Sequence, residues 1–136
     1  MAVNYKQLFM NYCDSEGVKY NDDDEETVSL SYRCDNLEDL RIVVFFHKDR
    51  NDVQFWSTFA SAKDEKRSAG LLACNSLNQE YRWVRFYLDK DWDLICEADA
   101  LLDPSSGGEE CLSIVRRMVN IIDEAYPKFM KALWAN

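Results

Sequence analysis

Three aspartates at alternate positions, Asp89, Asp91 and Asp93, form the densest group of potential metal ligands in the sequence. Carboxylate oxygens are the ligands that divalent cations such as Ca²⁺ prefer, so this group could hold a metal ion. The same residues are typical of an exposed hairpin tip, where Asp side chains accept hydrogen bonds from nearby backbone amides. The sequence favours the hairpin tip and predicts no metal site. The alternative is a small-ligand or metal-dependent sensor, or an enzyme, that uses this turn.

The other side chains capable of catalysis are isolated from one another. His47, the single histidine, ends a predicted strand and has no serine or cysteine near it in a recognisable motif. Residues 105–108 could hold a phosphate at a helix start, but Glu109 and Glu110 already place negative charge there, which favours a helix cap. We therefore predict no catalytic residue and no enzyme.

The cysteines and the acidic run 22–26 do not match known metal motifs. Five cysteines are scattered along the chain without a Cys-x-x-Cys pair, so they do not form a zinc motif. Each lies in or beside an apolar pattern, which predicts free thiols in a reducing compartment. An EF-hand loop counted from Asn21 requires glycine sixth and a carboxylate twelfth, where the chain has Glu26 and Tyr32. We expect no cofactor and no metal.

Composition and charge limit the class of protein. The chain has 136 residues, of which 47% are hydrophobic and 13% aromatic, and this predicts a single folded domain over residues 1–136. The formal net charge of -9 would repel phosphate backbones, so nucleic acid is not an expected partner. The longest apolar run, 42–46, is too short to span a bilayer, and the first residues lack a signal-peptide pattern. We expect a cytoplasmic protein that does not enter the membrane.

The periodicity of apolar residues predicts the elements that position these side chains. Alternation with a period of two predicts strands, and recurrence every three or four residues predicts helices. The strand 40–47 is apolar on both faces and should be central, whereas 27–34 should be an outer strand. Pro127 should kink the last helix or begin a separate last turn. The predicted order is helix 3–16, strands 27–34, 40–47 and 53–60, helix 63–77, strands 82–88 and 92–98, and a long helix from about 104.

These elements predict an α+β fold, in which helices pack on an antiparallel sheet and the strands 40–47 with 53–60, and 82–88 with 92–98, form hairpins. If helices cover one face of the sheet, the other face is too apolar for water alone. Aromatic residues beside an arginine are typical of protein interfaces. The alternative is that the first or last helix covers this face and makes it part of the core. The residues predicted to lie there are Val43, Phe45, Trp56, Trp83, Arg85, Tyr87 and Ile95, and all except Val43 are our candidate interaction residues.

The order α-β-β-β-α-β-β-α resembles the type III secretion chaperone-like fold. Within that fold, residues 75–78 at the end of the middle helix, the strand 82–89, the carboxylate-rich turn and the long last helix resemble the YbjN-like bacterial domain. The resemblance covers about residues 18–133. Asn75 and Asn78 are the positions most like that family, and we expect them to cap the helix C-terminus rather than contact a ligand. The turn 89–93 departs from the family pattern because it lacks glycine, which puts the turn geometry in question.

The resemblance implies a general role for the protein but identifies no catalytic reaction. Proteins of this family are mostly described as regulatory or uncharacterised, the related chaperones act by binding other proteins, and no catalytic residue carries over. We therefore expect a non-catalytic protein-binding or regulatory module with a chaperone-like architecture. Its partner would be a second copy of the chain, forming a homodimer, or a client protein.

Overall fold

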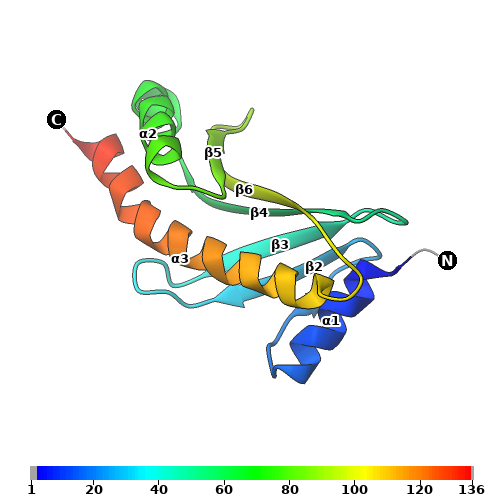
Figure 1. Ribbon diagram of the computed structural model, residues 1–136. Helices are drawn as coiled ribbons and strands as arrows, with labels where there is room; N and C mark the ends of the chain where they lie inside the picture. The colour runs from blue at the N-terminus through cyan, green and yellow to red at the C-terminus, as the bar shows by residue number, and fades with distance from the viewer. Residues whose placement is uncertain (1–2, 136) are drawn as a thin grey trace.

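The computed structural model describes residues 3–135, and within them the predicted order of helices and strands is confirmed with one added strand (Figure 1). The added strand, β1, is formed by two residues between the first helix and β2, a stretch for which no strand was predicted. The bounds are α1 Tyr5–Ser15, β1 Asn21–Asp22, β2 Thr27–Tyr32, β3 Leu40–Phe46, β4 Asp52–Ser61, the short 3₁₀ helix η1 Asp64–Lys66, α2 Arg67–Glu80, β5 Arg85–Leu88, β6 Asp93–Leu101 and α3 Gly107–Trp134.

Among the described residues the strands form one antiparallel sheet in the order β1-β2-β3-β4-β6-β5. Both predicted hairpins are present, as β3 with β4 and β5 with β6. The central place of β3 is confirmed. The prediction that 27–34 is an outer strand needs a small correction, because the two-residue β1 lies outside β2.

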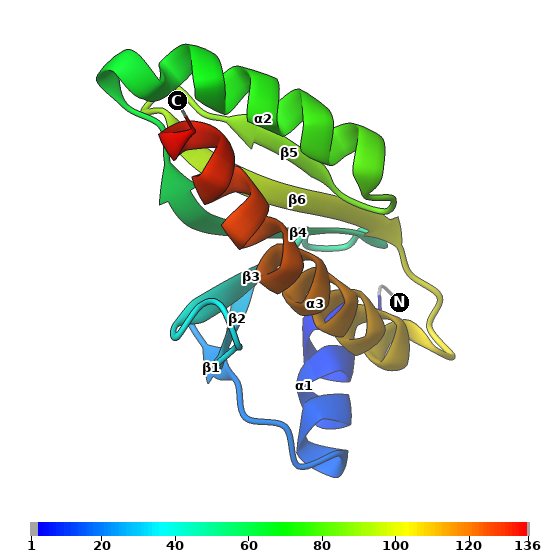
Figure 2. The ribbon, with the colours of Figure 1, turned by 90° about the vertical axis from the view of Figure 1, so that its left-hand side faces the viewer.

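The helices lie on one face of the sheet (Figure 2). α3 crosses the strands, α1 packs beside its N-terminal half, and α2 lies over β5. The largest fully buried side chains come from α1, α3 and the inward-facing positions of the strands: Phe9, Phe55, Phe129, Leu30, Leu40, Ile42, Leu94, Leu112, Met118, Ile122, Val28 and Val44.

Two glycines allow the helices to approach their neighbours closely. A Cβ atom at Gly108 would lie 2.7 Å from the Cβ of Tyr12 and 2.9 Å from the carbonyl oxygen of Leu8, so it would overlap α1. At Gly70 in α2 it would lie 2.5 Å from the Cβ of Ala62. Glycine has a lower helix propensity than alanine, but no larger residue fits at these two positions.

α3 is a single helix from Gly107 to Trp134 that passes through Pro127, so of the two outcomes predicted for Pro127, a kink or a separate last turn, the separate last turn does not form. None of the helices within residues 3–135 is long and apolar enough to cross a membrane.

Candidate protein-interaction face

Within residues 3–135, no helix covers the face of the sheet opposite α1, α2 and α3, which answers the question that the sequence left open. Along β3, the inward-facing residues Ile42 and Val44 are fully buried, whereas Val43 and Phe45 between them are only half-buried. The same alternation in β4 leaves Trp56 half-buried beside the fully buried Phe55. We call this surface the open face.

Strand register places five of the six candidate interaction residues together on the open face. Val43 pairs with Trp56, Trp56 with Glu97, and Glu97 with Arg85, so these four side chains form one row across β3, β4, β6 and β5. The other three candidates lie in the adjacent rows. Phe45 contacts Trp56, with ring centroids 6.1 Å apart, and Ile95 pairs with Tyr87.

A carboxylate that the sequence analysis did not select organises this row. Glu97 is 8% exposed, and it accepts hydrogen bonds of 2.5 Å from both the guanidinium of Arg85 and the hydroxyl of Tyr87. Arg85 also donates to Asp99 at 2.9 Å. Charge-assisted bonds of this kind are among the stronger ones, and they fix the long arginine side chain in one position. The open face therefore presents a preformed polar cluster beside its aromatic residues.

The cluster changes the acid–base behaviour of its members. Burial raises the pKa of Tyr87 to about 12, and the hydrogen bond to Glu97 adds to the shift because it favours the protonated phenol. The hydrogen bond to Asp99, with the nearby Glu97 charge, raises the pKa of Arg85. Both residues thus stay in their ordinary protonation states at neutral pH. Glu97 could have been found by predicting the hairpin register, which places it opposite Arg85.

Trp83 does not lie on the open face, and that prediction is wrong. Its backbone has φ 81°, which ends the strand alternation, so β5 begins only at Arg85. The indole ring lies on the helix side of the sheet, 5.1 Å from the guanidinium carbon of Arg117 in α3. The sequence pattern could not reveal this because an aromatic residue in the left-handed region is rare.

Asn75 and Asn78 do not cap the helix as predicted, because α2 continues to Glu80. Asn75 is exposed. Asn78 instead bonds to the backbone of Phe86 in β5: its side-chain oxygen accepts from the Phe86 amide at 2.7 Å and its amide group donates to the Phe86 carbonyl at 2.9 Å. The Asn78 side chain takes the place of a neighbouring strand, so the backbone amide and carbonyl of Phe86 at this edge of the sheet both have hydrogen-bond partners.

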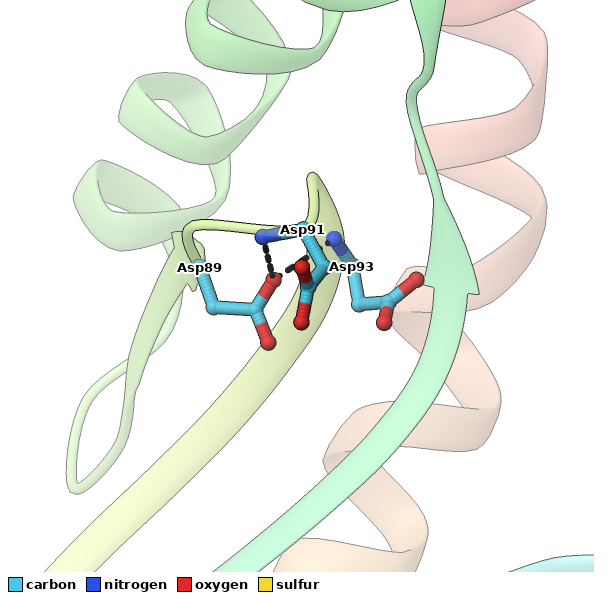
Figure 3. A group of neighbouring side chains, drawn as sticks. All are labelled: Asp89, Asp91 and Asp93. Carbon is cyan, nitrogen blue, oxygen red and sulfur yellow. Dashed lines mark hydrogen bonds between the residues drawn. The ribbon is translucent and has the colours of Figure 1, made fainter.

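The three aspartates lie together at the β5–β6 turn, as Figure 3 shows. One ligand oxygen from each lies within 4.8 Å of the others. One side-chain oxygen of Asp89 accepts hydrogen bonds from the backbone amides of Asp91 and Asp93, each at 2.9 Å. This is the role predicted for an aspartate at a hairpin tip. Trp92, with φ 64°, takes a left-handed backbone conformation that glycine adopts without a steric penalty. The geometry of the turn is explained without a metal ion.

The other candidate groups remain separate. His47 lies 3.7 Å from Asp52 near the β3–β4 turn. Ser106 takes the N-cap position of α3, within the predicted cap 105–108, but its side chain donates to Glu110 and makes no capping hydrogen bond. Burial raises the pKa of the Cys13 and Cys74 thiols to about 11, which makes both poor nucleophiles. These groups do not form a catalytic set.

Helices packed on one face of an antiparallel sheet give the chain an α+β fold, and proteins of type III secretion systems are among the solved structures with a similar fold. A chain in a structure titled "Crystal Structure of the ExsC-ExsE Complex" matches with a TM-score of 0.60 and 17% identity, covering 100% of both chains. A chain of the heterodimeric ExoU–SpcU complex from the type III secretion system of Pseudomonas aeruginosa matches with a TM-score of 0.55 and 13% identity, covering 93% of this chain and 98% of that one.

A further structure is titled "Crystal structure of YbjN, a putative transcription regulator from E. coli". It matches with a TM-score of 0.63 and 14% identity, covering 92% of this chain and 91% of that one. The family model for YbjN, described as "Putative bacterial sensory transduction regulator", matches residues 7–131. The chain therefore belongs to the YbjN family, and the resemblance suggested by its sequence is confirmed. No curated protein matches the sequence significantly.

Proposed function

We propose that this protein is a non-catalytic module that binds another protein through the open face of its sheet. The observation that supports this most is the combination of half-buried aromatic residues with the preformed Arg85–Glu97–Tyr87 cluster on a surface that no helix covers. Aromatic residues and arginine are enriched in the centres of protein interfaces. A polar cluster already held in place costs little additional side-chain entropy on binding.

The edges of the sheet are less suited to partners than its face. β1 at one edge has two residues, and at the other edge Asn78 occupies the hydrogen-bonding groups of Phe86. Addition of a partner strand at either edge would therefore form few backbone hydrogen bonds. This favours side-chain recognition across the face, centred on Trp56.

The proposed partner is a protein, with a second copy of this chain as the first candidate. The titles of the similar structures name complexes of two proteins, which supports binding of a protein here as well. The net charge of -9 favours a protein over a nucleic acid. The five cysteines of the sequence all lie within the described residues and are free, which supports action in the reducing cytoplasm.

Light scattering across a dilution series tests self-association. We expect a dimer that dissociates on dilution, and Trp56→Arg should shift the protein to monomer because it replaces an aromatic ring of the open face with a charged side chain that association would have to bury. The matched control is Trp134→Arg, which changes a 66% exposed tryptophan at the end of α3, away from the open face. A wild-type monomer at every concentration would exclude the homodimer.

In that case, proteins retained from lysate by the wild type would be compared with those retained by the two variants. Proteins that bind the wild type and Trp134→Arg but not Trp56→Arg would support a client on the open face. Identical sets for both variants would contradict the assignment of the face. Unfolding of Trp56→Arg, measured by circular dichroism, would show that Trp56 is part of the core.

A further inference from the structure

A second feature, on the helix side of the molecule, is a groove of about 460 Å³ between the segment that leads into β5 and the N-terminal half of α3. Its floor is apolar and includes Ala98, Ile114 and Met118. Trp83 forms one wall, and its side chain is 67% exposed. The groove thus combines a buried apolar floor with a large exposed aromatic ring.

The backbone at Trp83 is strained. A φ of 81° is unfavourable for a bulky residue, and glycine would adopt it without a steric penalty. The guanidinium carbons of Arg82 and Arg117 lie 5.6 and 5.1 Å from the centre of the indole ring, so the exposed ring is held by two cations. A strained residue that presents an exposed ring over a groove is a candidate for recognition, since strain of this kind concentrates at functional sites.

The charges of the groove define what it would accept. Its lining includes three carboxylates, Asp99, Glu109 and Glu110, and the guanidinium of Arg117, while the guanidinium of Arg82 lies near the Trp83 ring that forms the wall. Asp99 is paired with Arg85, whereas Glu109 and Glu110 form no ion pair with any residue of the described range 3–135, although Glu110 accepts a hydrogen bond from Ser106. An occupant with a positive charge at this rim gains Coulomb attraction, and an acidic occupant is repelled.

We infer that this groove is a second docking site, for a peptide segment of a partner protein that presents an apolar side chain next to Lys or Arg. The apolar side chain fills the space above Ile114 and Met118, against the ring of Trp83. The adjacent cation lies at the rim with Glu109 and Glu110. The site shares only Asp99 with the open-face cluster and does not depend on the function proposed for that face.

Selection from a random peptide library displayed on phage tests this inference. The full chain is the bait, and peptides that also bind Ser113→Arg are removed, because an arginine at this exposed groove position would obstruct the groove without disturbing the core. We expect the surviving peptides to carry an apolar residue beside Lys or Arg. Survival of no peptide, or of acidic peptides, would overturn the inference.

Affinities of the selected peptides, measured by fluorescence polarisation, give the second readout. Trp83→Gly should weaken binding at least about tenfold, as loss of an interface anchor does. Its melting temperature should equal or exceed that of the wild type, because glycine relieves the strain at this φ. Trp134→Ala is the matched control, because Trp134 is also an exposed tryptophan (66%) beside a cation. The Lys66 Nζ atom lies 4.1 Å from the centre of its ring. It should leave binding unchanged.

The outcomes separate the two surfaces. Trp56→Arg should bind the selected peptides as the wild type does, so failure of either proposal is distinguishable from failure of the other. Peptide affinities unchanged by Trp83→Gly would overturn the inference. A strongly lowered melting temperature for Trp83→Gly would also overturn it, because Trp83 would then serve packing rather than recognition.

Discussion

The two faces of the sheet are built from the same strands but differ in what they can do. On the covered face, Ile42, Val44 and Phe55 are fully buried beneath the helices. On the open face, their immediate neighbours are half-buried and surround a hydrogen-bonded ion cluster at Glu97. Because successive side chains of a strand point to opposite faces of the sheet, one residue can stabilise the core while its neighbour is available to contact a partner.

The difference in burial between the two faces shows that aromatic content alone does not identify the core. Phe55 and Trp56 are neighbours in β4, yet only Phe55 contributes to the buried cluster. A substitution at each should therefore affect different properties, and pairs of adjacent residues provide internal controls.

The largest contrast is expected between Phe55→Ala and Trp56→Ala. Phe55 is 0% exposed, so its truncation should leave a cavity and cost about 3–5 kcal/mol of the free energy of unfolding. Trp56 is half-buried, and we expect a loss of only about 1 kcal/mol. Urea denaturation monitored by far-UV circular dichroism measures both. Equal losses would mean that the open face is part of the core.

Gly108→Ala should disturb the packing of α1 against α3 and lower the free energy of unfolding. The added methyl group would lie 2.7 Å from Tyr12 Cβ and 2.9 Å from a backbone oxygen, so α1 must move away from α3. Overpacking of this kind costs about 1–3 kcal/mol. Ser113→Ala, at an exposed position of the same helix, is the control and should be nearly neutral. Unfolding midpoints that match for the two variants would show that α1 adjusts without cost.

Much of the fold could be predicted from the sequence because apolar periodicity determines both the type of an element and the face it buries. The order of the elements, both hairpins and five open-face residues followed from this periodicity. The two-residue β1 escaped prediction because polar Asn21 and Asp22 carry no apolar pattern, and they pair only because β2 lies beside them.

The errors at the candidate site occurred where backbone geometry departs from regular periodicity. Trp83 was assigned to the open face by alternation, and its positive φ turns it to the other side. Asn78 was predicted to cap its own helix, although its partner is Phe86 in a strand eight residues further on. Glu97 was overlooked because its importance depends on a cross-strand pair. Such contacts are tertiary, and local pattern does not contain them.

The polar cluster of the open face should contribute a smaller amount of stability than the core. Glu97→Gln removes the charge that Arg85 and Tyr87 bind, and hydrogen bonds to charged groups contribute about 1.5–3 kcal/mol when buried. The Arg85 side chain is 53% exposed, so solvent screening should reduce the loss to about 1 kcal/mol. Urea denaturation measures the change, and Asp99→Asn, at the exposed end of the cluster, should cost less. A larger effect for Asp99→Asn would place the centre of the cluster at Asp99 instead.

The finest test of the open face is the ionisation of Tyr87. Its pKa is raised to about 12 in the folded protein, from an ordinary value near 10 that the unfolded chain should show. The folded state therefore holds this proton more tightly, so the stability it contributes is complete below about pH 10 and is lost as the pH rises through about 12. The wild type should lose stability across this interval more steeply than Tyr87→Phe, which lacks the group.

Difference titration of tyrosinate absorbance, wild type minus Tyr87→Phe, isolates this residue from the other six tyrosines of the sequence. We expect one transition near pH 12. In a Glu97→Gln background the transition should move toward lower pH, because the carboxylate no longer opposes ionisation of the phenol. A transition near the ordinary tyrosine value in both backgrounds would mean that Glu97 and Tyr87 are not hydrogen-bonded in solution. The open face would then lack the preformed cluster that distinguishes it from an ordinary exposed sheet.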